Sequence, residues 1–316
     1  MVFDIKAAVA AAASQTPQSV ELFPAIVPGR VLHLDGDYLA YFASGNDDTE
    51  PGTARQNAFN RVELTRLRTG SESVIVHLSA AGCTKADRFI IATVKPYQGQ
   101  RNASRKPRNW AYLREVMESY EGHLFRPKVW PHREADDGMA YCAEIGDIAI
   151  STRDKDMRML PGLHINWMTC ELTHVPRDPR GGAAWNVTGP DGLQYGLKWL
   201  YLQLLQGDTA DNIPGLPRLN GLACGDARAA KYLATARDRD DAYGLIASAY
   251  GEHYGSGWAD ALAEQAALLW LRNDAQASLR NVLTAFPSCP DLTDAIYRLE
   301  SRILEELSNL AKFKSA

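Results

Sequence analysis

The alternation of short apolar segments with longer segments of helical spacing most restricts how this chain of 316 residues can fold. The apolar segments are bounded by polar residues or glycine, as buried strands are. They lie at 31–35, 73–79, 148–152 and 164–169. The helical segments lie at 53–69, 108–121 and 134–145. This order predicts an α/β fold in which helices flank a mainly parallel central sheet.

Near residue 190 the sequence pattern changes from alternating strand and helix segments to mainly helical segments. The stretch 175–192 is rich in proline and glycine and is expected to form an excursion or hairpin, and helical spacing dominates after it. The expected parts are an N-terminal extension over 1–30, an α/β core over 31–190 and a helical region over 191–316. The alanine-rich run at 7–14 is expected to be a frayed helix rather than a signal peptide, because Asp4 precedes it.

Nine acidic residues occur where the predicted strands end or helices begin. They are Asp35, Asp37, Glu134, Asp136, Asp137, Asp154, Asp156, Asp208 and Asp211. In a parallel sheet covered on both faces, chemistry gathers beyond the carboxyl ends of the strands. Carboxylates collected there would repel one another unless divalent cations neutralised them. Oxygen ligands suit Mg²⁺ or Mn²⁺, and two such ions are the usual device for cutting a phosphodiester, so the pattern predicts a two-metal phosphodiesterase.

Charge and cysteine content narrow the class of protein. The net charge is −4, yet eight basic residues lie between 85 and 114 and a second basic stretch covers 218–239. These stretches favour a phosphate backbone as partner, unless each is simply a solvated surface. Five isolated cysteines favour a reducing cytoplasm. No apolar run approaches the roughly 20 residues that span a bilayer, so no membrane partner is expected.

Four motifs in a fixed order carry a family resemblance. They are L-D-G-D at 34–37, E-A-D-D at 134–137, D-K-D at 154–156 and G-D-T-A-D-N-I-P-G at 207–215. Each alone is weak, because aspartate also caps helices and forms turns. Together they resemble the 5′→3′ exonuclease and flap endonuclease family, which includes the 5′-nuclease domain of bacterial DNA polymerase I. The layout is nearest the stand-alone phage enzymes, and the match runs from about Val31 to Leu233.

The resemblance implies a PIN-like, resolvase-like nuclease core with a helical arch at about 85–122, followed by a helix–three-turn–helix. It implies a monomeric, cytoplasmic 5′→3′ DNA exonuclease with flap endonuclease and RNase H-like activity, acting in DNA replication, recombination or degradation. The cofactor would be Mg²⁺, two ions or more, with Mn²⁺ as a substitute. The partner would be DNA with 5′ ends or flaps, and RNA–DNA hybrids as a further substrate.

Residue roles also follow from the resemblance. Asp35, Glu134 and Asp136 would hold the ion that activates water. Asp154, Asp156, Asp208 and Asp211 would hold the second ion, with Asp137 as an outer-shell or supporting acid. In the arch, Tyr97 would stack on the terminal base and Arg101 would clamp the scissile phosphate. Further DNA contacts would come from Lys95, Arg105, Lys106, Gly215, Gly225, Arg228 and Lys231.

Two positions depart from the family pattern. Ser79 stands at a strand end where the family has another metal-binding aspartate, and Gln98 replaces the arch lysine, with Lys95 and Lys106 as substitutes. These departures leave a catalytically weakened DNA-binding member as one alternative. A haloacid-dehalogenase-type phosphohydrolase is another, because Asp35, Asp37, Ser79 and the motif at 207–215 satisfy its signature. It leaves E-A-D-D and D-K-D unexplained.

Overall fold

A six-stranded sheet forms the centre of the molecule. The computed structural model describes residues 23–99 and 105–315. The strands are β1 (Val27–Asp35), β2 (Ser71–Ser79), β3 (Arg126–Trp130), β4 (Ile148–Ser151), β5 (Gly162–Ile165) and β6 (Leu172–Val175). Their order is β3-β2-β1-β4-β5-β6, and only the edge strand β6 runs antiparallel to its neighbour. The carboxyl ends of β1, β2 and β4 therefore meet at one edge.

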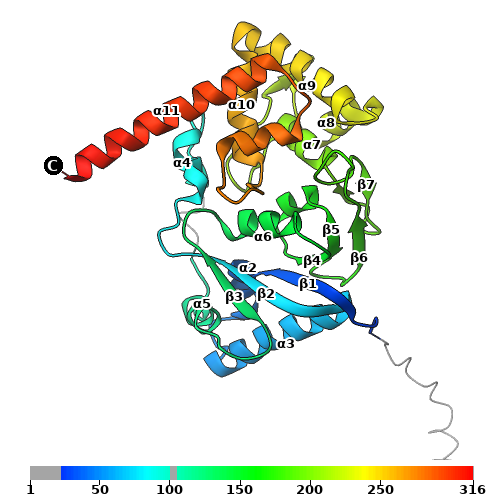
Figure 1. Cartoon of the computed structure of the whole chain (residues 1–316), viewed down its shortest axis with the longest axis vertical. Coiled ribbons are helices and arrows are strands. Elements are labelled where there is room, and N and C mark those ends of the chain that lie inside the picture. Colours follow the sequence, from blue (N-terminus) through cyan, green and yellow to red (C-terminus); the bar gives the residue numbers. More distant parts are fainter. Residues whose placement is uncertain (1–22, 100–104, 316) are drawn as a thin grey trace, which may run out of the picture.

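Helices cover both faces of this sheet (Figure 1). On one face lie α2 (Gly36–Ala43), α3 (Pro51–Thr69) and α5 (Trp110–Glu118), and on the other lies α6 (Ala135–Ala143). Side chains alternate along the strands as the pleat requires. Leu32 and Leu34 of β1 enter the core beneath α3, whereas Ile148 and Ile150 of β4 enter a second core with Met139 of α6.

The second core continues into the C-terminal helices. These are α7 (Lys198–Gln206), α8 (Asp226–Tyr232), α9 (Arg239–Tyr254), α10 (Trp258–Leu269) and α11 (Pro290–Ser315). Helix α10 packs against α7, α9 and α11, and the short α4 (Arg88–Ile91) contacts both α10 and α11. The second core therefore contains residues from both sides of residue 190, where we expected the α/β core to end and the helical region to begin.

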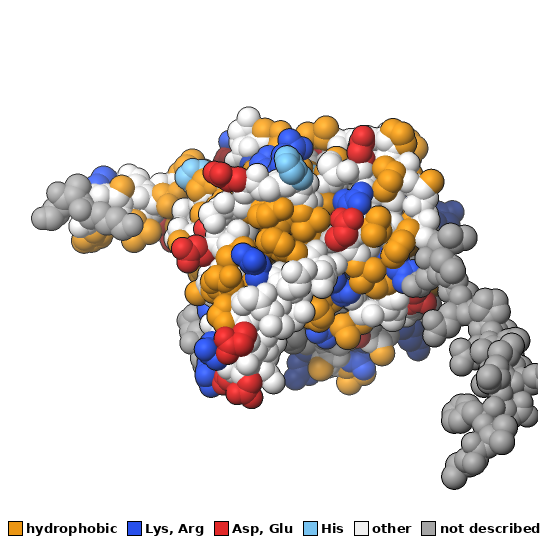
Figure 2. All heavy atoms as spheres, turned by 90° about the horizontal axis from the view of Figure 1, so that it is seen from below, with side chains coloured by type: hydrophobic (Ala, Val, Ile, Leu, Met, Phe, Trp, Pro, Cys, Tyr) orange, Lys and Arg blue, Asp and Glu red, His pale blue; other side chains and the backbone are white. Residues whose placement is uncertain are grey.

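The far end of α11 projects from the body of the molecule (Figures 1 and 2). Leu304, Leu310 and Phe313 are exposed on it. On the face seen in Figure 2, basic and acidic side chains are interspersed with hydrophobic ones. None of the described helices combines the length and apolar character needed to cross a membrane.

The predicted fold class is confirmed, with differences in detail. The strand expected at 164–169 occupies Gly162–Ile165 instead, because the Asn166 side chain accepts hydrogen bonds from the backbone N atoms of Met168 and Thr169 and turns the chain. Strands β3 and β6 were not expected, since short edge strands need little apolar sequence. The stretch 175–192 does contain part of a hairpin, β7 (Val187–Thr188) with β8 (Gln194–Tyr195).

Candidate metal centre

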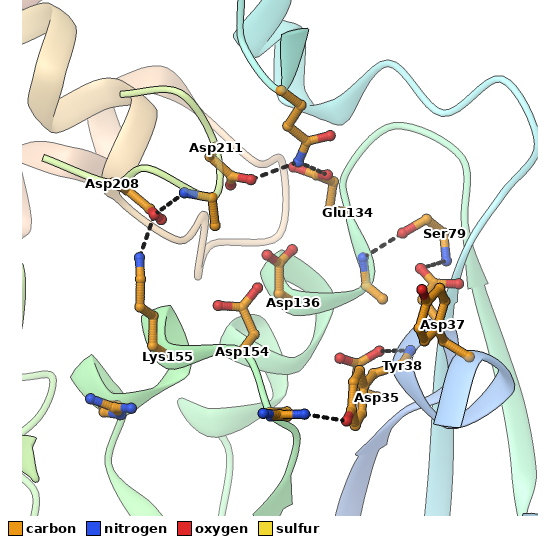
Figure 3. Close-up of a pocket in the computed structure, with 16 residues that line it drawn as sticks. Asp35, Asp37, Tyr38, Ser79, Glu134, Asp136, Asp154, Lys155, Asp208 and Asp211 are labelled. Carbon is orange, nitrogen blue, oxygen red and sulfur yellow. Dashed lines mark hydrogen bonds and ion pairs between the residues drawn. The ribbon is translucent and has the colours of Figure 1, made fainter. Parts of the chain in front are cut away.

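Seven acidic side chains line one cavity of about 630 Å³ at the carboxyl edge of the parallel strands. They are Asp35, Asp37, Glu134, Asp136, Asp154, Asp208 and Asp211. They come from the end of β1, the start of α2, the start of α6, the turn after β4 and the loop after α7 (Figure 3). Segments far apart in the sequence thus bring carboxylates to one place, as the motif order led us to expect.

Asp35 illustrates the electrostatic state of this cavity. Its carboxylate accepts hydrogen bonds from the backbone N of Tyr38, at 2.9 Å, and from Thr152 Oγ1, at 2.8 Å. Burial, with the nearby charge of Asp37, nevertheless raises the pKa of Asp35 to about 7. The two hydrogen bonds therefore do not offset the cost of burial and of the neighbouring negative charge.

Asp136 and Asp137 are adjacent in α6 but lie in different surroundings. Burial and the charges of Glu134 and Asp137 raise the pKa of Asp136 well above its usual value. Asp137 is fully buried and accepts hydrogen bonds from Arg88, Nη1 at 2.8 Å and Nη2 at 2.7 Å, and from the backbone N of Arg272 at 2.8 Å. Although burial opposes it, Arg88 holds the pKa of Asp137 below its ordinary value. Asp137 therefore lies outside the lining of the cavity, with its carboxylate bound by Arg88 and by the backbone of Arg272.

A second group of acids lies after β4 and α7. Carboxylate oxygens of Asp156, Asp208 and Asp211 lie within 4.8 Å of one another, close enough to share one ion. Asp156 is buried beneath the cavity lining, where burial and the charges of Asp154 and Asp208 raise its pKa well above the usual value. Lys155 forms an ion pair with Asp208 (Figure 3).

Two glycines shape the loop that carries Asp208 and Asp211. Gly207 and Gly215 have φ of +74° and +65°, and a Cβ on Gly215 would lie 2.3 Å from the backbone N of Gly207. The backbone N of Gly215 donates to Gln265 Oε1 at 2.9 Å. The expected DNA contact at Gly215 is therefore corrected: the residue is buried and its amide is already used.

Tyr97 and Gln98 join acids from two segments. The Tyr97 hydroxyl donates towards Glu134 Oε2 at 2.9 Å and Asp211 Oδ2 at 3.1 Å. Gln98 Nε2 lies 3.2 Å from an oxygen of each of the same two acids. Because Tyr97 is only 4% exposed, its ring cannot stack on a base in this conformation, which corrects that expectation. Its place suits the orientation of Glu134 and Asp211.

The basic stretch between 85 and 114 is divided in its contacts. Lys85, Arg88 and Arg114 turn inward and form ion pairs with acids. Their respective partners are Glu134, Asp137 and Asp37. These three cations neutralise the protein's own acids and do not form the expected phosphate track.

Other predicted DNA contacts lie on the surface. Lys95, Arg105 and Lys106 are exposed. Arg105 pairs with Asp47 at 3.1 Å between Nη2 and Oδ2. Arg101 lies outside the described residues, so its expected role as a phosphate clamp stays a prediction.

The segment before α8 contains a small hairpin, β9 (Arg218–Leu219) with β10 (Leu222–Ala223), which accounts for the long spacer after Gly215. Gly225 and Lys231 are exposed, and Arg228 is half-buried with its guanidinium on the backbone O of Ala223. Their DNA contacts stay predictions.

Ser79 lies on the cavity wall, at the end of β2. Its Oγ accepts a hydrogen bond from the backbone N of Ala135 at 3.0 Å, and its backbone N donates to Asp37 Oδ2 at 3.1 Å. The strand end therefore faces the acids, with a hydroxyl in place of a carboxylate.

Lys155 was not singled out from the sequence, although its place inside D-K-D was a signal. Arg153 and Arg158 also line the cavity and were missed, because no spacing rule marks them. Within the described ranges, no basic side chain lies at ion-pair distance from Asp35 or Asp136. A set of hard carboxylate oxygens with raised pKa values suits a divalent cation, so the residues fit the metal that the motifs imply.

Comparisons with known proteins agree with the overall fold. No protein-family model matches the chain. The structure resembles that of a bacteriophage T5 protein co-crystallised with metal ions, with a TM-score of 0.51 and 16% identity over 87% of this chain and 98% of that one. It also resembles the bacteriophage T5 flap endonuclease in a complex with DNA and metal ions, with a TM-score of 0.50, 15% identity and the same coverage. The resemblance to the 5′→3′ exonuclease and flap endonuclease family is thus confirmed at the level of the fold.

The sequence also resembles part of a DNA polymerase. The chain is 30% identical over 203 residues to the thermostable DNA polymerase I of Thermus thermophilus. The match covers 60% of this chain and 22% of the polymerase, so the chain spans about a fifth of that relative's length.

Proposed function

We propose that this protein is a metal-dependent nuclease that hydrolyses phosphodiester bonds in DNA. The observation that carries the proposal is the cavity lined by seven acids, in which the pKa values of Asp35 and Asp136 are raised. Buried carboxylates without a counter-charge are costly, and proteins retain them where a cation binds. The shared fold with a flap endonuclease crystallised with DNA and metal ions supports the same reaction class.

The acids of the cavity would hold two divalent ions, of which Mg²⁺ is the expected one. When bound, such ions lower the pKa of the attacking water and stabilise charge on the phosphoryl group. The protein's own residues set the geometry. Tyr97 and Gln98 hold Glu134 and Asp211 in fixed orientations, and Arg153 on the cavity wall offers a cation to phosphate oxygens.

The finer activity that we propose is 5′→3′ exonuclease cleavage, with flap endonuclease and RNase H-like activity on related substrates. Exposed Lys95, Arg105 and Lys106, with Arg228 and Lys231 on α8, would contact the DNA backbone. We expect a monomer that acts in the cytoplasm during DNA replication, recombination or degradation. The five free cysteines fit that reducing compartment.

The test is incubation with Mg²⁺ and a 5′-flapped duplex labelled at either end, beside a chromogenic phosphomonoester. We expect nucleotides released from the 5′ end, no cleavage in EDTA, and a loss of about a hundredfold or more in Asp154→Asn and Asp208→Asn. Phosphate release from the monoester alone would support the haloacid-dehalogenase alternative. DNA binding without cleavage by the metal-loaded wild type would support the weakened member, and a 3′→5′ ladder would contradict the polarity.

A further inference from the structure

Lys155 lies inside the second group of acids, where a metal ion would be expected. Its Nζ forms an ion pair with Asp208 and lies 3.8 Å from Asp156 Oδ1. The side chain of Asp208 is only 2% exposed, so this is not a surface ion pair of the kind that contributes little. The Lys155 side chain lines the cavity and is 31% exposed, which leaves it a path away from the acids.

A divalent ion would need the same oxygens. Oxygens of Asp156, Asp208 and Asp211 lie within 4.8 Å of one another. Mg²⁺ binds carboxylate oxygens at about 2.0–2.1 Å, and an ammonium nitrogen sits at about 2.7–2.9 Å. Two cations on one oxygen would lie within a few ångströms and repel strongly. The ion and the ammonium group therefore exclude each other from these acids.

We propose that Lys155 is an internal counter-ion that competes with the second metal ion. Its ammonium group neutralises Asp208 and Asp156 while no ion is bound, and it is displaced into the cavity when an ion arrives. This inference rests on the proposed metal-dependent function and adds to it a residue that weakens metal binding while keeping the metal-free acids together.

Lys85 makes a related contact with Glu134 but is a less direct case. Its Nζ lies 3.2 Å from Glu134 Oε1 and is also bound by Gln98 Oε1, and the side chain does not line the cavity. The ion-pair partners given for Lys155 are Asp208 and Asp156, two of the three acids that would share the ion. Replacing Lys155 therefore tests its competition with the ion directly.

The experiment is a calorimetric titration of the full chain with Mn²⁺, without DNA, at about pH 8, where free carboxyl groups are ionised. Lys155→Met should bind Mn²⁺ about tenfold more tightly than wild type, because a competing positive charge is gone. In EDTA its Tm should fall, and Mn²⁺ should raise it by more than it raises the wild-type Tm. Lys155→Arg, which keeps the charge, should bind within about twofold of wild type.

Lys198→Met is the matched control. It removes the same charge at the start of α7, about 12 Å along the helix axis from Gln206, and should leave Mn²⁺ affinity unchanged. Equal or weaker Mn²⁺ binding by folded Lys155→Met overturns the inference and leaves the proposed function standing. Should that variant not fold, Lys155→Gln is judged by the same criterion. If wild type itself binds no Mn²⁺, the metal centre and the proposed function fail together.

Discussion

Two adjoining regions of this protein treat buried acids in opposite ways. Behind α6, Asp137 accepts hydrogen bonds from both Nη atoms of Arg88 and from the backbone N of Arg272. In front of α6, Asp136 faces the cavity, where burial and neighbouring acids raise its pKa. The residues are adjacent in sequence and chemically identical, so the difference lies entirely in what the fold places beside them.

The comparison separates structural acids from functional ones. A buried carboxylate that the protein neutralises itself stabilises a junction, here between α4, α6 and the segment after α10. A buried carboxylate that the protein leaves without a cation costs stability and is kept where a ligand supplies the charge. The Arg88–Asp137 pair also gives the C-terminal helices a function: the backbone O atoms of Leu268 and Trp270 accept hydrogen bonds from Arg88 and fix it behind the site.

The largest expected effect comes from replacing the carboxylate of Asp136 or of Asp137 with an amide. Asp136→Asn should lower the cleavage rate about a hundredfold or more, because the proposed metal centre loses one negative charge. It should leave the metal-free protein as stable as wild type or more so, since repulsion is relieved. Asp137→Asn should instead lower the free energy of unfolding by about 3–5 kcal/mol, because Arg88 is left buried without a counter-charge.

Urea denaturation in EDTA and a cleavage assay in Mg²⁺ measure the two effects separately. Arg88→Met combined with Asp137→Leu serves as the control, since replacing a whole buried pair with apolar groups is often tolerated. Equal destabilisation by Asp136→Asn and Asp137→Asn would remove the distinction between the two regions.

A second, smaller effect concerns pH. The pKa of Asp35 is raised to about 7, so between about pH 4 and about pH 7 the folded state holds a proton that the unfolded state has lost, and it releases that proton as the pH rises through about 7. Metal-free stability should therefore fall as the pH rises to about 7 and level off by about pH 8, and the part of the fall between about pH 6.5 and about pH 8 should be on the order of 2 °C in Tm. The buried histidines His33 and His164, with pKa lowered to about 4, contribute a rise only below about pH 6.5.

Thermal unfolding in EDTA and in saturating Mg²⁺ across this range checks the sign. Saturating Mg²⁺ should abolish or reverse the fall, because a bound ion favours the ionised acids. A metal-free Tm that rises over this range would contradict the assignment of an uncompensated acid cavity.

The comparison also explains what the sequence could predict. The acids that line the cavity were predictable because strand ends in a parallel sheet meet at one edge, and short motifs mark them. The inward ion pairs were not. Arg88 and Arg114 stand in a run of basic residues that looks like a phosphate-binding surface, and only the fold turns them towards Asp137 and Asp37.

The DNA contacts predicted for Tyr97 and Gly215 disagree with the structure for a related reason. Motif matching assigned both to DNA, yet each is buried and bonded within the protein, Tyr97 to two acids and Gly215 to Gln265. Motifs report which residues occur together in a chain, whereas the direction of a side chain or an amide depends on long-range packing. Among the strands, β1 and β2 were found from their apolar runs, but β3 (Arg126–Trp130) carries too few apolar residues to be recognised.

The smallest effect that we predict comes from adding one carboxylate to the acidic cavity, at Ser79. Ser79 lies on the cavity wall beside Asp37, so Ser79→Asp would add a carboxylate where the structure has a hydroxyl. Affinity for hard cations rises with the number of carboxylates, so the Mg²⁺ concentration for half-maximal cleavage should fall about three- to tenfold. Mn²⁺, which binds such sites more tightly, should partly substitute for this change in wild type. Ser79→Asn, of the same size without the charge, is the matched control in a Mg²⁺ titration of cleavage rate. If both variants fold and share the wild-type Mg²⁺ requirement, the end of β2 does not act on the ions, and the acids of β1, α6 and the loop after α7 bind them without it.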